Sequence, residues 1–271
     1  MSDHRPVTPG SPIPVATLPN LRSLGGWPTA DGRRVREGVL FRSTDLSRLA
    51  GTDVTAVEGL GVRTVVDLRT ASERRRRPDV RLSGTDVLVL DVLADAVEAA
   101  PTDMAEILED PTRARDLLGD GRAEAAFTHA YEHLVTLPSA RASYGAFFTS
   151  LAAGTGEPTL FHCTTGKDRT GWAAATTLML LGVPDDVVEH EYLLTNDQLL
   201  PALQPILDHF ASLGGDPDLL LPVLGVRPQY LATSLEAMRR AYGDLATYFS
   251  EGLGIDDATQ DVLRDRLLTE P

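Results

Sequence analysis

The sequence is poor in several features that define whole classes of protein. It has a single cysteine, Cys163, so no disulfide can form within the chain, which is consistent with a reducing compartment. No apolar run approaches the ~18 residues that a membrane span needs, and the first twenty residues contain no hydrophobic segment of a secretory signal. We therefore expect a cytoplasmic protein without stable membrane insertion. Export by a route without a signal peptide is the alternative.

Positive charge is also scarce. The net charge of -14 argues against a nucleic-acid partner or an anionic membrane surface, because both require a positive field. The acidity is typical of a soluble protein and leaves room for one small positive pocket. Hydrophobic residues make up 42% and charged residues 24% of the chain, which is ordinary for a globular domain.

The distribution of proline divides the chain into two parts. Residues 1–19 contain five prolines and little periodicity, which predicts an extended, mobile arm. Residues 20–271 are expected to form a single domain. Four short, mostly apolar runs predict strands at 39–42, 63–68, 86–90 and 158–163. Helices are predicted at 53–60, in segments between 101 and 153, and at 170–181, 185–194, 199–213, 228–242, 248–253 and 256–268. This alternation indicates an α/β protein with a sheet flanked by helices.

The cysteine lies between a predicted strand and a predicted helix, in the stretch HCTTGKDRTG. A loop of five residues between Cys163 and Arg169 allows successive backbone N–H groups to converge on one anion. The positive end of the following helix points to the same place. Gly166 permits a turn that a side chain would resist, and the guanidinium of Arg169 can bind two oxygens of a phosphate.

The same positive field would act on the thiol. Cysteines at helix N-termini near cations have pKa values of ~3.5–7.5 instead of ~8.5, so Cys163 is expected to be a thiolate. The chemistry this predicts is nucleophilic attack on phosphorus, with a phosphocysteine that water later hydrolyses. Thr170 would hydrogen-bond the thiolate, and His162 would hold the loop rather than act as a base.

The stretch HCTTGKDRTG also suggests other kinds of site. A nucleotide-binding P-loop fails on spacing, because its glycine would fall at Phe161 and its Ser or Thr at Asp168. A metal site fails for want of further cysteines, so no metal or other cofactor is expected. A rhodanese-like or arsenate-reductase-like Cys-loop enzyme and an inactive phosphate-binding module remain as alternatives.

The stretch HCxxGKDRTG resembles the signature of the cysteine-dependent protein tyrosine phosphatases. It is most similar to the atypical bacterial phosphatases of the protein tyrosine phosphatase B type, which act on phosphotyrosine, phosphoserine or phosphothreonine, and phosphoinositides. Further segments resemble motifs of that family: NLRSLGG, LFRSTDLSRL, VVDLRTASE, YLLTND and LGVRPQYLATSLEAM. Ser23, in the first of these, departs from the usual aspartate.

The resemblance implies a phosphatase fold with a mostly parallel central sheet and a helical lid, for which residues 196–225 are the candidate. It implies that Cys163 is the nucleophile and that Arg169 binds phosphate. Thr164, Thr165, Gly166, Lys167 and Asp168 would supply loop amides. Lys167 would favour a phosphoinositide, so the expected partner is a phosphorylated protein or a phosphoinositide. The oligomeric state is not predicted.

The leaving oxygen needs a proton from a carboxyl group. Asp168 lies inside the loop and matches an aspartate of the family signature. Asp95, or Asp91 before it, follows the strand at 86–90, where the family places an acid. We expect Asp168 to be the general acid, with Asp95 as the second candidate.

Three other groups of residues received structural interpretations. The run Glu73–Arg77 is expected to be a solvated helix end rather than an anion-binding patch. Asp67, Arg69 and Glu73 are interpreted as a structural network of ion pairs. His129 and His133 are interpreted as surface residues, because the glutamate of an HExxH motif is replaced by Ala130.

Overall fold

The computed structural model describes residues 8–96 and 104–270. Its centre is a sheet of five strands in the order β1-β2-β5-β3-β4. The strands are short: β1 Arg22–Ser23, β2 Leu40–Ser43, β3 Thr64–Asp67, β4 Asp86–Val89 and β5 Thr159–His162. Only β1 is antiparallel to its neighbour, so the predicted mostly parallel sheet is confirmed.

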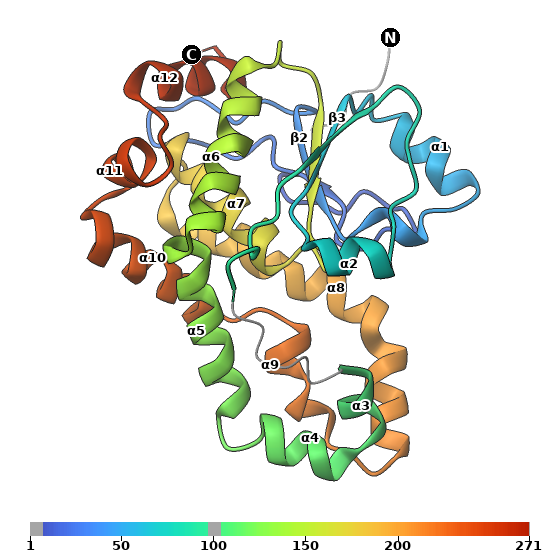
Figure 1. The fold of residues 1–271 in the computed structure, drawn as a ribbon. Coiled ribbons are helices and arrows are strands. Elements are labelled where there is room, and N and C mark those ends of the chain that lie inside the picture. The colour runs from blue at the N-terminus through green and yellow to red at the C-terminus, as the bar shows by residue number, and fades with distance from the viewer. Residues whose placement is uncertain (1–7, 97–103, 271) are drawn as a thin grey trace.

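Helices account for most of the remaining chain (Figure 1). The helices before β5 are η1 Leu46–Arg48, α1 Thr52–Glu58, α2 Ala71–Arg76, α3 Met104–Glu109, α4 Pro111–Leu118, α5 Arg122–Thr136 and α6 Pro138–Ala153. Those after β5 are α7 Asp168–Leu180, α8 Asp185–Ser212, η2 Pro217–Leu219, α9 Leu221–Leu224, α10 Pro228–Tyr242, α11 Leu245–Thr247, the π-helical turn η3 Tyr248–Gly252 and α12 Asp257–Leu267. None of these helices is both long and apolar enough to cross a membrane.

Both faces of the sheet are buried because successive residues of a strand point to opposite sides. Val66 and Phe161 belong to the large core cluster formed with the helices α5 to α7. Val65 and Leu160, their neighbours in sequence, belong to a second cluster that contains Val57 of α1. The strands therefore consist of nearly continuous apolar runs, as is typical of parallel strands.

The N-terminal segment differs from the expected mobile arm over the part that is described. Residues 8–19 lie against the domain: Val15 and Leu18 are buried in the second cluster, and Thr17 hydrogen-bonds Asp53. The backbone contains turns at residues 9–10 and 16–19, and the apolar side chains between the prolines attach the segment to the domain. Residues 1–7 lie outside the described residues.

A second difference concerns α8, which is one helix of 28 residues where the sequence predicted two. Pro201 and Pro205 lie inside it. Its distal half packs with α3, α4 and η2 around Leu207, Phe210 and Leu220, a small core separate from the other two (Figure 1). We call this group of elements, at the bottom of Figure 1, the lower lobe. It contains the segment 196–225, which is the lid candidate.

The order of the parallel strands defines where the site must lie. β2, β5 and β3 end at the same edge of the sheet, so the segments that follow them meet there. Those segments are 44–48 after β2, 68–73 after β3 and 163–169 after β5. The cysteine loop is the central one of the three.

Candidate active site

The cysteine loop is formed where β5 gives way to α7. β5 ends at His162, and α7 begins at Asp168 with Lys167 as its N-cap residue. Gly166 has φ +65°, and a Cβ atom there would lie 2.2 Å from the backbone oxygen of Ser43. Only glycine fits at this position, because any side chain would require both a left-handed backbone and a displacement of β2.

The inner side of the loop carries unpaired donors. Among the described residues, no acceptor is bound by the backbone N–H groups of Thr164, Thr165, Gly166 and Lys167. Unpaired buried N–H groups are rare in folded proteins, and four successive ones beside a helix N-terminus form a nest suited to a tetrahedral oxyanion.

The thiol of Cys163 is 1% exposed. Burial by itself raises its pKa, but the charge of Arg169 and the hydroxyl and N–H of Thr170 outweigh burial, so the pKa lies below its ordinary value. The Thr170 hydroxyl is buried and has no hydrogen-bond partner among the described residues, so it remains available to the thiol. The roles of Arg169 and Thr170 in the reaction stay predictions.

Arg169 is held in a defined orientation by Glu73. Its Nη1 and Nη2 atoms donate to the two carboxylate oxygens of Glu73 at 2.6 and 2.7 Å, and Nη1 is also 3.4 Å from the carbonyl oxygen of Leu68. Among the described residues, nothing accepts from Nε or from the second Nη2 hydrogen. These two donors form the side-on fork of a guanidinium, the geometry that binds two oxygens of a phosphate.

Glu73 is the residue whose position the sequence did not reveal. The sequence placed it in a structural network of ion pairs with Asp67 and Arg69. It instead pairs with Arg169 at the cysteine loop, where it also accepts from Thr164 Oγ1 at 2.5 Å. Burial by itself raises the pKa of Glu73, but the hydrogen bonds and charge of Arg169 hold it well below the usual range. The sequence pattern that could have located Glu73 is its capping box with Thr70, because this motif fixes the start of α2 beside the loop.

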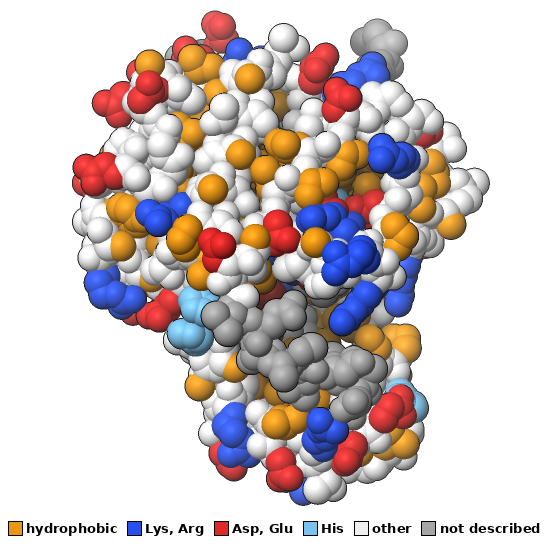
Figure 2. Space-filling model, viewed as in Figure 1, with side chains coloured by type: hydrophobic (Ala, Val, Ile, Leu, Met, Phe, Trp, Pro, Cys, Tyr) orange, Lys and Arg blue, Asp and Glu red, His pale blue; other side chains and the backbone are white. Residues whose placement is uncertain are grey.

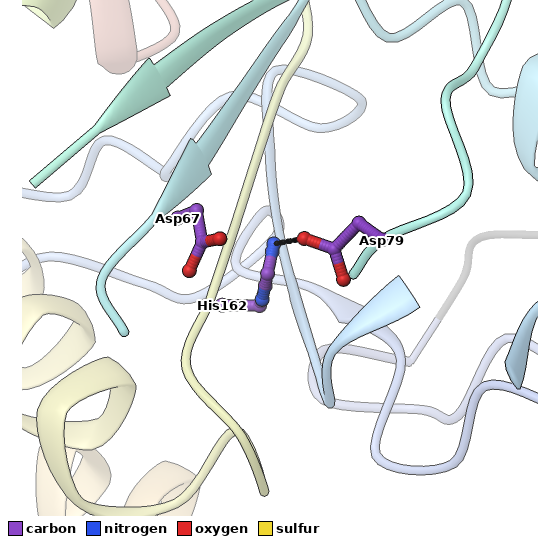
Figure 3. A group of neighbouring side chains, drawn as sticks. All are labelled: Asp67, Asp79 and His162. Carbon is purple, nitrogen blue, oxygen red and sulfur yellow. Dashed lines mark ion pairs between the residues drawn. The ribbon is translucent and has the colours of Figure 1, made fainter. Parts of the chain in front are cut away.

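Beneath the loop, Asp67, Asp79 and His162 lie close together (Figure 3). His162 Nδ1 is 3.0 Å from the carbonyl oxygen of Cys163, and its Nε2 is 3.4 Å from Asp79, so the imidazole supports the loop as expected. The guanidinium of Arg69 binds Asp67 at 2.8 Å and Asp79 at 2.5 Å. Because Arg69 already occupies oxygens of both carboxylates, we interpret this cluster as a support for the loop rather than a metal site.

The carbonyl side of the loop is held by a second, fully buried ion network. Gly166 O accepts from Arg42 Nη2 at 2.7 Å and from Asn20 Nδ2 at 3.0 Å. Arg42 and Arg22 both bind Glu191 at 2.8 Å, with side chains that are 0–1% exposed. Burial and the charge of Arg42 lower the pKa of Arg22 to about 10. Segments 20–22, 42–43 and 191–195 thus meet at the outside of the loop.

Asp168, the expected general acid, is anchored through one oxygen only. Its Oδ1 accepts from the Tyr131 hydroxyl at 2.6 Å and from Lys167 Nζ at 2.9 Å. The Tyr192 hydroxyl lies 2.7 Å from that of Tyr131. Among the described residues Oδ2 has no hydrogen-bond partner, so it is the oxygen that can carry a transferable proton.

Lys167 is the only lysine among the 25 basic residues of the chain. It is 4% exposed, and its ammonium group lies 4.4 Å from the centre of the Phe127 ring as well as beside Asp168. A lysine so enclosed adds positive charge at the entrance to the loop.

A cavity of about 230 Å³ opens beside Asp168 and Arg169. Its other walls are mostly apolar and include Leu93, Phe127 and Leu134. His133 also lines it, with its ring 4.3 Å from that of His129 along α5. A pocket with apolar walls and a charged base suits a substrate that carries a phosphate on an organic group.

Asp95 does not line this cavity. It is exposed, and its carboxylate accepts from the backbone N–H of Ser139 at the start of α6. Asp91 accepts from the N–H of Ala71 at the start of α2. Both aspartates that follow β4 therefore hold the first turns of helices, whereas Asp168 faces the cavity.

Comparison with known proteins agrees with this geometry. Residues 13–269 match the model of the tyrosine phosphatase family. The "Putative tyrosine-protein phosphatase" of Cupriavidus necator is 32% identical over 254 residues, covering 89% of this chain and 84% of that protein. The triple specificity protein phosphatase PtpB of Mycobacterium tuberculosis is 32% identical over 280 residues, covering 92% and 96%.

The fold and the family match thus define a phosphatase, a hydrolase of phosphate esters with an α/β fold. The chain belongs to the tyrosine phosphatase family, and its substrates are phosphorylated proteins.

Proposed function

We propose that the chain hydrolyses phosphotyrosine through a phosphocysteine at Cys163, without a metal. The observation that carries the proposal is the buried thiol of lowered pKa, set among four backbone N–H groups and the Nε–Nη2 edge of Arg169, none of which has an acceptor among the described residues. The N–H groups of residues 164–168 and Arg169 would bind the three non-bridging phosphate oxygens and stabilise the charge of the transition state.

The reaction proceeds in two displacements. Cys163 Sγ forms a bond to phosphorus while the bond from phosphorus to the ester oxygen breaks, and that oxygen takes a proton from Asp168 Oδ2. Water then attacks phosphorus and loses its proton to Asp168, and the S–P bond breaks to release inorganic phosphate and restore the thiolate. Thr170 stabilises the departing thiolate by donating its hydroxyl hydrogen.

The range of substrates is wider in this proposal than phosphotyrosine. The similarity to a triple specificity phosphatase supports phosphoserine, phosphothreonine and phosphoinositides as further substrates. Lys167 at the entrance would attract a second phosphate of an inositol ring. The lower lobe that contains residues 196–225 would act as a lid, the location would be the cytoplasm, and neither nucleic acid nor membrane insertion would be involved.

Phosphate release from a phosphotyrosine peptide, a phosphoserine peptide and phosphatidylinositol phosphates tests the proposal. In the presence of a chelator the wild type should turn over phosphotyrosine, and Cys163→Ser should reduce kcat below detection. Rapid acid quenching should trap phosphate covalently on the wild type and none on the serine variant. Undiminished activity in Cys163→Ser, or a requirement for metal, would overturn the mechanism. Binding of phosphate without turnover would favour the inactive phosphate-binding module instead.

A series of aryl phosphates with increasing leaving-group pKa identifies the acid. Asp168→Asn should lower kcat by about 10²-fold or more on the poorest leaving group and little on the best one. Asp95→Asn is the matched control and should alter stability rather than the slope of the series. A steeper slope in the Asp95 variant alone would transfer the role to Asp95.

A further inference from the structure

The surface beside the cysteine loop combines arginines that point outward with carboxylates that point inward. Two segments border the loop at Thr164: α2, through Glu73 Oε1, and the segment of η1, through the N–H of Asp45 on Thr164 O at 3.2 Å. Four exposed arginines lie on or just after these two helices, and we call them the arginine rim: Arg48, Arg75, Arg76 and Arg77.

The carboxylates of the same segments already have arginine partners. Asp45 binds Arg77 and lies 3.8 Å from Arg69. Glu73 binds Arg169, and Asp79 binds Arg69. Among the described residues, Arg77 is thus the one member of the rim that has a carboxylate partner, and none of these carboxylates pairs with Arg48, Arg75 or Arg76.

Among the described residues, the guanidinium groups of Arg48, Arg75 and Arg76 contact no carboxylate, carbonyl or aromatic ring. Residues 63–81 hold seven arginines and three carboxylates, in a chain whose net charge is -14. Figure 2 shows these blue side chains gathered over α2, on a face whose other regions carry both signs of charge. Cations are favoured in the last turn of a helix, and this explains part of the pattern. It does not explain why four arginines follow one another or why Arg48 is also an arginine.

From these observations we infer that the arginine rim binds acidic residues that flank the phosphorylated residue of a peptide substrate. This inference rests on the proposed phosphatase function and adds the class of peptide to it. Arg75 and Arg76 follow Glu73 by two and three residues, a rise of about 3–5 Å along α2. An extended peptide advances about 3.3 Å per residue, so this rise corresponds to side chains roughly one to two positions from the phosphorylated residue.

A peptide fits the charge distribution better than an anionic bilayer does. A bilayer would approach the whole face, and the net charge of -14 would oppose it. A single extended chain meets only the rim and avoids the acidic remainder of the surface.

The experiment compares two phosphotyrosine peptides that differ only in their flanks, one with Asp and Glu on both sides and one with Ala. The wild type should prefer the acidic peptide by about fivefold or more in kcat/KM at low salt, and the preference should shrink as salt screens the rim. The double variant Arg75→Glu/Arg76→Glu should remove or reverse the preference while hydrolysing p-nitrophenyl phosphate as the wild type does. Arg239→Glu, an exposed change on α10, is the matched control and should retain it.

Each outcome separates this inference from the proposed function. Hydrolysis of p-nitrophenyl phosphate with equal rates on both peptides would overturn the inference alone, as would a preference that survives in the double variant. Absence of hydrolysis of every substrate would overturn the proposed function. Loss of binding to phosphatidylserine vesicles in the double variant, with the peptide preference intact, would make the rim a membrane surface and overturn the peptide inference.

Discussion

Arginine–carboxylate pairs hold both sides of the cysteine loop. The pairs differ in whether guanidinium N–H groups remain accessible to a ligand. On the carbonyl side, Arg22 and Arg42 are completely buried with Glu191, and Arg42 Nε, which has no partner among the described residues, is buried as well. On the inner side, Arg169 is paired with Glu73, and within the described part of the chain its Nε and one Nη2 hydrogen have no acceptor at the edge of the cavity. An arginine–carboxylate pair therefore stabilises the fold when it is fully buried. It is suited to binding an anion when one edge of the guanidinium remains accessible.

The largest effect is expected from replacing the arginine with the open edge. Arg169→Lys keeps the charge but loses the fork, so kcat/KM for phosphotyrosine should fall by about 10³-fold or more. The melting temperature should change by only a few degrees, because the pair is at the edge of the cavity. Steady-state kinetics and thermal unfolding of the same preparation measure both quantities.

Arg42→Lys is the matched change on the carbonyl side and should show the reverse profile, with a clear loss of thermal stability and a smaller loss of kcat/KM. If the two lysine variants lost activity and stability in equal proportion, the distinction between the two sides of the loop would be wrong.

The next largest effect concerns the buried network itself. Glu191→Ala leaves two buried arginines without a carboxylate and should cost about 3–5 kcal/mol of unfolding free energy, roughly 10 °C in Tm. Chemical denaturation and calorimetry are the measurements. Glu189→Ala, an exposed change on the same helix, should lie within about 0.5 kcal/mol of the wild type.

A triple variant sharpens the same comparison. Arg22→Met/Arg42→Met/Glu191→Leu removes every charge of the network and should recover most of the stability that Glu191→Ala loses. Activity should stay low, because Gly166 O no longer has its arginine donor. Full recovery of kcat would show that the network has no role in positioning the loop.

The smallest effect is expected at Thr170. The folded-state pKa of Cys163 lies below its ordinary value, so the thiolate fraction falls only as pH drops through that lowered pKa. Thr170→Val removes a donor to the thiolate and should raise the pKa, moving the pH profile of iodoacetamide alkylation upward. At a pH below the wild-type midpoint the variant should react roughly tenfold more slowly. An unchanged profile would assign the lowered pKa to Arg169 alone.

The central features of the fold could be predicted because their causes are local. Each short apolar run bounded by turn residues became a strand within a residue or two, and Gly166 marked the tight turn before α7. The interruption of α8 was predicted wrongly, since proline is a strong local signal and packing of the lower lobe overrode it.

The partners of the loop could not be predicted, because they are distant in sequence and chemically ordinary. Glu73 lies 96 residues from Arg169, in a run of charges that is typical of a solvated helix end. Glu191 lies on a helix that gives no sign of two buried arginines 149 and 169 residues away. The sequence alone does not distinguish Asp95 from Asp168 as the general acid. In the structure Asp95 accepts from the start of α6, whereas Asp168 accepts from the Tyr131 hydroxyl beside the cavity.

One feature of the loop bears on how the enzyme can be observed. The single cysteine and the single lysine of the chain stand four residues apart in it. A thiol reagent and an amine reagent would therefore report on one place, apart from the α-amino group, and mass spectrometry of a single peptide would read both. Occupancy of the loop by phosphate or a substrate becomes a stoichiometric chemical signal, obtained from the native sequence without any engineered label.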